Sequence, residues 1–346
     1  MMSQRLTVRD VGEFGLIAKL ADALPKSVRM ADSVLLGIGD DAAIWRPDPG
    51  RDVVITTDSL VEGVHFRLDW TDWRSLGHKS LAVNVSDIAA MGADPKLAVI
   101  SLGLRREDPV EGLQDLYRGM GDLAERTGMI IAGGDIVRSP SALVIHVTAL
   151  GQSHPSGPLT RGGATPGDLI GVSGTLGASA AGLKLLEEDL ASPRRSASVA
   201  DMLIDAHIAP EPRIELGRIL AEQGATAAMD LSDGLLGDLP KILMASEVSA
   251  ILEEGAIPVA AAVRALFPDD YLDMALRGGE DYELLFTAPP SAFAEIALRA
   301  QEKGAPVTAI GRIEAPRSNG PELWLEQRTG NWQVLTPGAW DHFAGA

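Results

Sequence analysis

The sequence contains no cysteine among its 346 residues. This absence excludes disulfide bonds, thiolate metal sites and cysteine nucleophiles, and it fits a reducing compartment. Aromatic residues make up only 4% of the chain, so the core must be built mainly from Ala, Leu, Ile and Val. No uncharged apolar run approaches the roughly 20 residues that span a bilayer, and residues 1–15 lack the apolar segment of a secretion signal. We therefore expect a cytoplasmic protein without membrane association.

Positive charge is also scarce. The 30 Lys and Arg residues face 48 Asp and Glu residues, which gives a net charge of −18. Such a chain repels a polyanion unless a basic patch or a metal ion intervenes, and the sequence contains no basic run. We therefore do not expect nucleic acid as a partner. The chain is about two ordinary domains long, and its 46% hydrophobic residues can form a large core.

Residues 151–167 are dense in Gly, Pro, Ser and Thr, which is typical of a connector between domains. We therefore predict an N-terminal domain at 1–151 and a C-terminal domain at 152–346. In the first domain we expect strands at 53–57, 129–132 and 142–150, a turn at 133–135, a helix at 80–91, and a helix from Pro109 to Gly128 with Asp108 as N-cap. The second domain alternates strand and helix patterns, which predicts an α/β or α+β fold.

Four segments bring aspartate together with Gly, Ser or Thr, at residues 37–41, 56–59, 133–135 and 230–234. Asp87, on an expected helix, is a fifth element. Each segment by itself is typical of ordinary turns and helix caps. Three of them, however, place an aspartate directly after an expected strand, where open α/β sheets gather their ligand sites. We therefore expect several of these carboxylates to lie close together.

Carboxylates that lie close together repel each other, and they repel a phosphate, unless a dication lies between them. Mg²⁺ suits this pattern, because it prefers oxygen ligands and retains waters and substrate phosphates in its shell. The neighbouring glycines let backbone N–H groups approach phosphate oxygens. The residues therefore predict a Mg²⁺-phosphate site and leave the phosphate acceptor open.

Two other phosphate-binding motifs are excluded. The sequence contains no GxxxxGK[ST], so a P-loop is absent. Gly37, Gly39 and Ala42 have the spacing of a dinucleotide fingerprint, but Asp40 and Asp41 would put negative charge where a pyrophosphate should lie. The nucleotide would therefore have to be bound through aspartates and metal ions.

The acidic segments and their neighbours resemble a known family, and the matching sequences are GIGDDAA, TTDSLVEGVHF, VNVSDIAAMGA, GGD, LTRGGA, MDLSDGL and GGEDYEL. They are similar to those of the thiamine-monophosphate kinases, which belong to the AIR-synthase (PurM)-like ATP-binding enzymes. The resemblance runs from about Gly12 to Phe343. It implies a two-domain PurM-like fold, in which the N-terminal sheet pairs across a homodimer and a C-terminal α/β domain follows. It also implies transfer of the ATP γ-phosphoryl group to thiamine monophosphate, giving thiamine diphosphate and ADP.

The resemblance also implies roles for individual residues. The implied ligands of several Mg²⁺ ions are Asp40, Thr56, Thr57, Asp58, Asp87, Asp135, Asp230 and Asp233. Of these, the implied catalytic carboxylates are Asp58, Asp135 and Asp233. The residues implied for ATP are Tyr117, Gly134, Asp135, Arg161 and Ser232. Those implied for thiamine monophosphate are His65, Glu280 and Trp340, and a carboxylate and an aromatic face suit a cationic thiazolium and a pyrimidine ring.

A phosphate monoester already carries an anionic oxygen near neutral pH, so its attack on ATP needs no general base. We therefore expect direct in-line transfer without a phosphoenzyme, by positioning and electrostatic stabilisation. Two alternatives stay open: another PurM-like ATP-dependent enzyme, such as an aminoimidazole ribonucleotide synthetase, and a non-catalytic module that binds Mg-nucleotide. The segments GVHF and GGEDYEL favour the thiamine enzyme.

Overall fold

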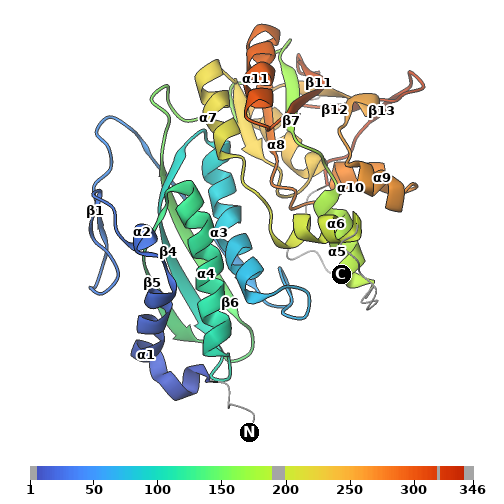
Figure 1. Cartoon of the computed structure of the whole chain (residues 1–346). Helices are drawn as coiled ribbons and strands as arrows, with labels where there is room; N and C mark the ends of the chain where they lie inside the picture. Colours follow the sequence, from blue (N-terminus) through green and yellow to red (C-terminus); the bar gives the residue numbers. More distant parts are fainter. Residues whose placement is uncertain (1–5, 189–198, 318–319, 339–346) are drawn as a thin grey trace. The chain divides into compact units, whose positions relative to one another are not determined.

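The computed structural model describes residues 6–188, 199–317 and 320–338. The chain divides into two compact units (Figure 1): an N-terminal unit of Met1–Ile88 and Asp94–Pro155, and a C-terminal unit of Ala89–Ala93 and Ser156–Ala346. Both units combine helices with a sheet, so the predicted α/β (α+β) class is confirmed. Within the described ranges, no helix has the length and apolar character that a membrane span requires.

The N-terminal unit is built on a four-stranded sheet with the order β3-β6-β4-β5. Its strands are β3 (Val53–Val61), β4 (Asp94–Leu104), β5 (Ile130–Arg138) and β6 (Val144–Gln152). β6 pairs antiparallel with β3 and β4, whereas β4 and β5 are parallel. β3 and β5 are therefore the two edge strands of this sheet. A separate two-stranded sheet consists of β1 (Val34–Leu36) and β2 (Ile44–Trp45).

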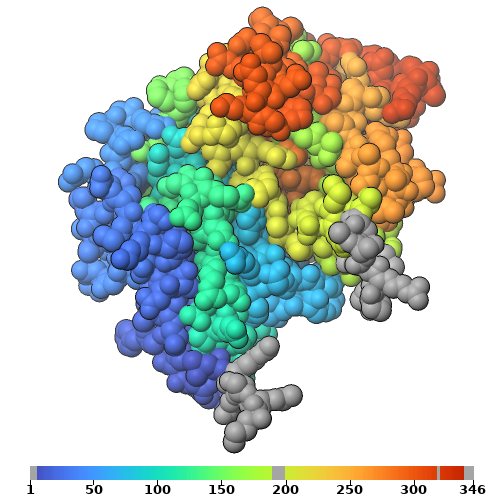
Figure 2. All heavy atoms as spheres, viewed as in Figure 1, coloured from blue at the N-terminus to red at the C-terminus, as the bar shows by residue number. Residues whose placement is uncertain are grey.

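Two helices of this unit lie side by side over the four-stranded sheet, as Figure 1 shows for α3 and α4. The helices of the unit are α1 (Val8–Ala23), α2 (Lys26–Arg29), α3 (Trp73–Ala90) and α4 (Val110–Thr127). Glycines allow the close contact of α3 and α4: a Cβ at Gly77 would lie 1.9 Å from the Leu116 carbonyl oxygen, and one at Gly119 would lie 1.9 Å from that of Arg74. In the space-filling view, α1 packs along α4 at the surface (Figure 2).

Several sequence-based expectations for this unit were wrong in detail. β3 continues to Val61, so Asp58 lies inside the strand and not just after it. Residues 133–135 do not form a turn, because they pair with β4 as part of β5. Pro109, and not Asp108, is the N-cap of α4. The Asp108 carboxylate instead accepts hydrogen bonds from the backbone and side chain of Arg105.

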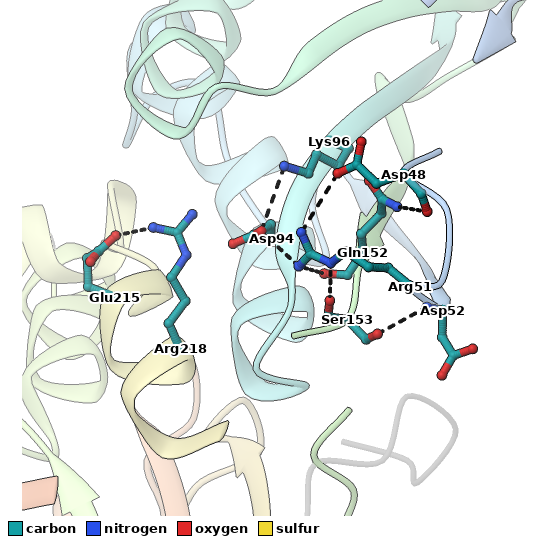
Figure 3. Close-up of polar contacts among 9 residues, drawn as sticks. All are labelled: Asp48, Arg51, Asp52, Asp94, Lys96, Gln152, Ser153, Glu215 and Arg218. Carbon is teal, nitrogen blue, oxygen red and sulfur yellow. Dashed lines mark hydrogen bonds and ion pairs between the residues drawn. The ribbon is translucent and has the colours of Figure 1, made fainter. Parts of the chain in front are cut away.

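Arg51 ties together three strand ends at one end of the four-stranded sheet (Figure 3). Its Nε donates to the Ser153 carbonyl oxygen at 2.6 Å, and its Nη2 donates to Asp94 Oδ2 at 2.9 Å and to the Gln152 carbonyl oxygen at 3.2 Å. The Asp52 N–H donates to Ser153 Oγ at 3.1 Å. A mostly buried guanidinium therefore joins the start of β3 and β4 to the end of β6.

The C-terminal unit contains a seven-stranded sheet with the order β13-β12-β9-β11-β7-β10-β8. The β9–β12 pair is parallel and the other neighbours are antiparallel. The strands are β7 (Leu169–Ser173), β8 (Ala227–Asp230), β9 (Ser249–Glu253), β10 (Leu284–Ala288), β11 (Val307–Glu314), β12 (Leu323–Glu326) and β13 (Trp332–Val334). Sequence patterns predict strands at 168–174, 225–230, 249–253 and 282–287, which correspond approximately to β7, β8, β9 and β10, whereas β11 to β13 were not predicted.

Helices cover both faces of this sheet, because neighbouring residues of β10 face two different apolar cores. Leu285 packs into a core with α5 (Ala178–Glu187), α6 (Val199–Ile208), α8 (Leu235–Ser246), α9 (Ala261–Leu266) and α10 (Tyr271–Arg277). Phe286 packs into a second core with α7 (Ile214–Gln223) and α11 (Pro290–Glu302). A short 3₁₀-helix, η1 (Glu254–Ala256), follows β9. The predicted alternation of strands and helices therefore forms three layers.

Candidate functional site

The N-terminal unit brings Thr56, Asp58 and Asp87 together between β3 and α3. Thr56 and Asp58 are two residues apart on β3 and so face the same side of the sheet. Thr56 Oγ1 donates to Asp87 Oδ2 at 2.5 Å. Burial, and next the charge of Asp87, raise the pKa of Asp58 to about 6, although His146 lowers it. Two carboxylates therefore lie near enough to repel each other.

This arrangement fits a hard dication. The described residues contain no group of three or more His, Cys, Asp and Glu side chains placed to hold a metal ion by themselves. Two carboxylates and a hydroxyl group are nevertheless the kind of donor set that Mg²⁺ uses when waters and substrate phosphates complete its shell. Burial and the charge of Asp87 both disfavour the ionised form of Asp58, and a cation at this position would favour it.

Thr57 and Asp135 lie on the other face of the same sheet. Thr57 Oγ1 contacts His146 Nε2 and Thr148 Oγ1, each at 3.0 Å. Asp135 is in register with Ser101 of β4. Because β3 and β5 are opposite edge strands, Asp135 is three strand spacings, roughly 14 Å, from β3. Asp58 and Asp135 of the same chain therefore do not lie close together in the four-stranded sheet.

Three further predicted site residues of this unit, Asp40, Tyr117 and Gly134, have separate positions. Asp40 is exposed, and its Oδ1 accepts the Asp41 N–H at 2.8 Å. Tyr117 is only 7% exposed in the core beneath α4, and burial raises the pKa of its hydroxyl group. Gly134 leaves no room for a side chain, because a Cβ there would lie 1.9 Å from the Ile100 carbonyl oxygen. Tyr117 and Gly134 thus each have a packing role.

His65 follows β3 in the GVHF segment. The ring nitrogen Nδ1 of His65 accepts a hydrogen bond from the Val61 backbone N–H at 3.1 Å. The backbone N–H of His65 donates to the Val61 carbonyl oxygen at 2.9 Å. Because Nδ1 is an acceptor, the neutral ring carries its proton on Nε2. The imidazole is therefore oriented by the end of β3 and presents Nε2–H as a donor.

In the C-terminal unit, the loop after β8 carries a second acidic group. Lys241 Nζ lies 2.6 Å from Asp233 Oδ2 and 2.8 Å from Asp238 Oδ1. The Asp233 N–H also donates to Asp238 Oδ2 at 2.9 Å. Burial raises the pKa of Asp238, although Lys241 opposes this shift. Asp230, the last residue of β8, is 5% exposed.

The sequence predicts a helix at 232–246 with Ser232 as its N-cap, but Ser232 is not the N-cap of α8. The N-cap of α8 is Gly234, whose φ of 82° is left-handed. A Cβ at Gly234 would lie 2.8 Å from the Gly278 carbonyl oxygen, so the loop needs glycine at this point. The close approach of residue 278 shows that the GGEDYEL segment packs directly on this loop.

Two backbone hydrogen bonds join these segments. The Glu280 N–H donates to the Ser232 carbonyl oxygen at 2.8 Å, and the Tyr282 N–H donates to that of Leu231 at 3.0 Å. The family resemblance implied that Ser232 binds ATP and that Glu280 binds thiamine monophosphate. The fold therefore puts a predicted nucleotide residue and a predicted acceptor residue on adjacent loops.

Sequence reasoning missed the roles of two other acidic residues in GGEDYEL. Asp281 accepts N–H groups of Gly177 at 2.7 Å and Ser179 at 3.0 Å, at the start of α5, and burial raises its pKa to about 7. Glu283 Oε2 accepts hydrogen bonds from Ser173 Oγ at 2.5 Å and Arg213 Nε at 2.7 Å. A dense run of acidic residues beside glycines was the only signal in the sequence.

Two predicted site residues of the C-terminal domain remain, Arg161 and Trp340. Arg161 is exposed, and its carbonyl oxygen accepts Ser246 Oγ at 3.2 Å. Trp340 lies outside the described residues. The C-terminal unit thus offers one compact group, formed by the loop after β8 and the GGEDYEL segment.

The comparisons with known proteins agree with this architecture. Residues 39–153 match the family model of the AIR synthase related protein, N-terminal domain, and residues 165–322 match that of the C-terminal domain. The protein class is thus an AIR synthase related protein that contains both domains. The thiamine-monophosphate kinase of Bacillus subtilis is 34% identical over 96% of this chain and 99% of its own length. That of Escherichia coli K12 is 41% identical over 96% of this chain and 98% of its own length.

Solved structures give the same result. The thiamine-monophosphate kinase of Stenotrophomonas maltophilia K279a has a TM-score of 0.80 and 38% identity, and the match covers 90% of this chain and 96% of that one. AaThiL complexed with AMPPCP and TMP has a TM-score of 0.75 and 30% identity, with 99% and 100% covered. The chain belongs to the thiamine-monophosphate kinase family.

Proposed function

We propose that this chain transfers the γ-phosphoryl group of ATP to thiamine monophosphate, giving thiamine diphosphate and ADP. One relative of similar structure was solved with an ATP analogue, AMPPCP, and with TMP. The observation that carries the proposal is the 2.8 Å hydrogen bond between the Glu280 N–H and the Ser232 carbonyl oxygen. It holds the loop proposed for ATP beside the loop proposed for the acceptor.

Phosphoryl transfer requires this adjacency, because the attacking oxygen must come within about 3–3.5 Å of the γ-phosphorus in line with the leaving group. In the proposal, Ser232 and Arg161 bind ATP oxygens, and His65 presents Nε2–H to the acceptor. Glu280 contacts the cationic end of the acceptor. Transfer is direct, since an acceptor phosphate is already anionic near neutral pH.

The metal site is a second part of the proposal. Thr56, Asp58 and Asp87 hold Mg²⁺, which when bound neutralises charge on both phosphates. The other proposed ligands are Asp40, Thr57, Asp135, Asp230 and Asp233. We also propose the functional domain boundary near residue 151 and a cytoplasmic location, which fits a chain without cysteine.

A homodimer is the third part of the proposal. The edge strands β3 and β5 expose apolar side chains, with Ile55 at 65% and Val137 at 53%. Pairing with the sheet of a second copy would cover such residues. Asp58 and Asp135 lie on opposite edges of one sheet, so a metal cluster that uses both needs Asp135 from a second copy of the chain.

Mixing two inactive variants tests this dimer. Asp58→Asn and Asp135→Asn each damage every site of their own homodimers. In heterodimers formed by mixing, one site carries both substitutions and the other carries neither, so activity should return. No return of activity in heterodimers that are isolated through a different affinity tag on each variant would refute shared sites.

The function itself is tested by a coupled assay for ADP with chromatography of the products. We expect turnover with thiamine monophosphate and Mg²⁺, and about background rates with thiamine, with formylglycinamidine ribonucleotide, or without Mg²⁺. ATP binding without turnover would support a non-catalytic module. Turnover with the ribonucleotide would support an aminoimidazole ribonucleotide synthetase.

A further inference from the structure

Glu280 belongs to a rigid turn. Its φ of +64° is left-handed, which residues other than glycine adopt only at a cost in free energy. A Cβ at the preceding Gly279 would lie 2.6 Å from the Ser232 carbonyl oxygen. The following Asp281 carboxylate is fixed by two N–H groups at the start of α5. The backbone at Glu280 therefore has little freedom to move.

A buried histidine contacts the Glu280 side chain. His207 lies on α6, and its side chain is 8% exposed, whereas that of Glu280 is 27% exposed. His207 Nδ1 lies 3.3 Å from Glu280 Oε2 and 3.0 Å from Ser179 Oγ. One carboxylate oxygen thus faces the interior, while part of the side chain stays open to solvent.

Ser179 Oγ either donates to His207 Nδ1 or accepts from it, depending on the tautomer of the ring. A carboxylate can only accept a hydrogen bond, so His207 Nδ1 donates to Glu280 Oε2 when it carries a proton. Both the neutral Nδ1–H tautomer and the imidazolium satisfy this requirement. In both forms Nδ1–H can donate to Glu280 Oε2, which lies 3.3 Å away.

From this geometry we infer that His207 is a positioning residue that holds Glu280 in the orientation that binds the cationic acceptor. The inference rests on the proposed function, in which Glu280 contacts thiamine monophosphate. A carboxylate anchored through one oxygen loses less side-chain freedom when a ligand binds. His207 therefore strengthens acceptor binding, although it lies on α6, outside the motifs that identify the family.

Substitutions of both residues test this inference in the full-length enzyme with Mg²⁺ and ATP. His207→Leu removes Nδ1 and should raise KM for thiamine monophosphate about tenfold, which corresponds to the loss of one hydrogen bond to a charged group. KM for ATP and kcat should each change less than about twofold. His207→Asn retains a donor near the Nδ1 position and should restore most of the affinity. His207→Gln places its amide nearer to Nε2 and should restore less.

A double variant shows whether the histidine acts through the carboxylate. His207→Leu combined with Glu280→Gln should have the same KM for thiamine monophosphate as Glu280→Gln alone. Ser179→Ala is the matched control, because it removes the other contact of Nδ1 and leaves the carboxylate in place. Its KM should stay within about twofold of the wild-type value. Thermal melting of every variant separates these effects from loss of the fold.

Four results would overturn the inference. They are an unchanged KM for thiamine monophosphate in His207→Leu, an equal rise of KM for ATP and for thiamine monophosphate, effects that multiply in the double variant, and a Gln variant that binds the acceptor better than the Asn variant. If His207→Leu does not fold, the KM values for thiamine monophosphate of His207→Asn and His207→Gln still test the inference. A wild-type chain without thiamine-monophosphate turnover would refute the proposed function instead, whereas normal turnover with unchanged KM in His207→Leu refutes only the role of His207.

Discussion

Two pairs of neighbouring carboxylates in this protein differ in how their charge is balanced. Asp58 lies near Asp87, and among the described residues no Lys or Arg forms an ion pair with Asp58. In the C-terminal unit, Lys241 lies between Asp233 and Asp238, at 2.6 and 2.8 Å. Burial and the charge of Asp87 disfavour the ionised form of Asp58, whereas the second pair has a lysine between its two carboxylates.

The difference distinguishes a site that favours an external cation from one that is complete within the protein. Burial, and next the charge of Asp87, raise the pKa of Asp58, and a bound dication would lower it again. Lys241 already supplies positive charge to Asp233. In the proposed function, Asp233 must therefore share its carboxylate between Lys241 and a metal ion, whereas Asp58 has no such competitor.

The largest effect is expected from Asp58→Asn. We expect kcat to fall about 10³-fold, because a charged ligand of the proposed metal site is lost. The melting temperature of the metal-free protein should stay equal or rise, since one of two repelling charges is removed. ADP release and thermal melting measure both effects, with the exposed Asp115→Asn as control. A variant that retains more than about a tenth of the activity would contradict the role of Asp58.

The second largest effect is a loss of stability, which we expect from Lys241→Met. The substitution leaves Asp233 and the fully buried Asp238 side chain without their cation. We expect the free energy of unfolding to fall by about 2–3 kcal/mol, at the lower end for buried pairs because Lys241 is partly exposed. Urea unfolding measures it. Adding Asp238→Asn should restore most of the loss, and a double variant as unstable as Lys241→Met would show that charge was not the cause.

The pH dependence of stability gives a smaller effect. Asp58 has a pKa of about 6 in the folded protein against an ordinary 3.8, so the folded state binds this proton more tightly than the unfolded chain does. Its contribution to the free energy of unfolding therefore falls as pH rises from about 4 to 6, by at most about 1.4 kcal/mol per pH unit. Asp281, with a pKa raised to about 7, acts with the same sign.

Thermal melts of wild type and Asp58→Asn between pH 4 and 7 isolate this contribution, because Asp281 is common to both. The stability difference, wild type minus variant, should fall with rising pH. Mg²⁺ should stabilise the wild type above about pH 6 more than below it, and the variant less at every pH. A difference that rises with pH would show that Asp58 is not repelled in the folded state.

The smallest effect is expected from Arg51→Met. Arg51 balances Asp94 within the N-terminal unit, as Lys241 balances its two carboxylates in the other unit. We expect a loss of about 1–2 kcal/mol in the free energy of unfolding, because the partners of Arg51 are two carbonyl oxygens, the Asp94 carboxylate and the more distant, exposed Asp48 carboxylate. Urea unfolding measures this loss. A loss larger than that of Lys241→Met would show that Arg51 contributes more to stability than Lys241 does.

The sequence predicted the acidic segments, and the structure brings part of them together. Thr56, Asp58 and Asp87 meet because β3 and α3 pack on each other, and this could be expected from a strand followed by a helix. The separation of Asp58 from Asp135 could not be expected, because it depends on the strand order of the sheet. The contact of His207 with Glu280 depends on the packing of α6, and nothing in the local sequence indicates it.

By itself, the sequence determined the family, the fold class and the candidate residues of the site, because motifs and periodic patterns are local properties of the chain. Only the tertiary structure decided which carboxylates are neighbours, which one carries its own lysine and which one has a raised pKa. These properties depend on distances between residues far apart in the sequence and on burial. Electrostatic energy depends on both, so the same residue type, aspartate, has different roles at positions 58, 238 and 281.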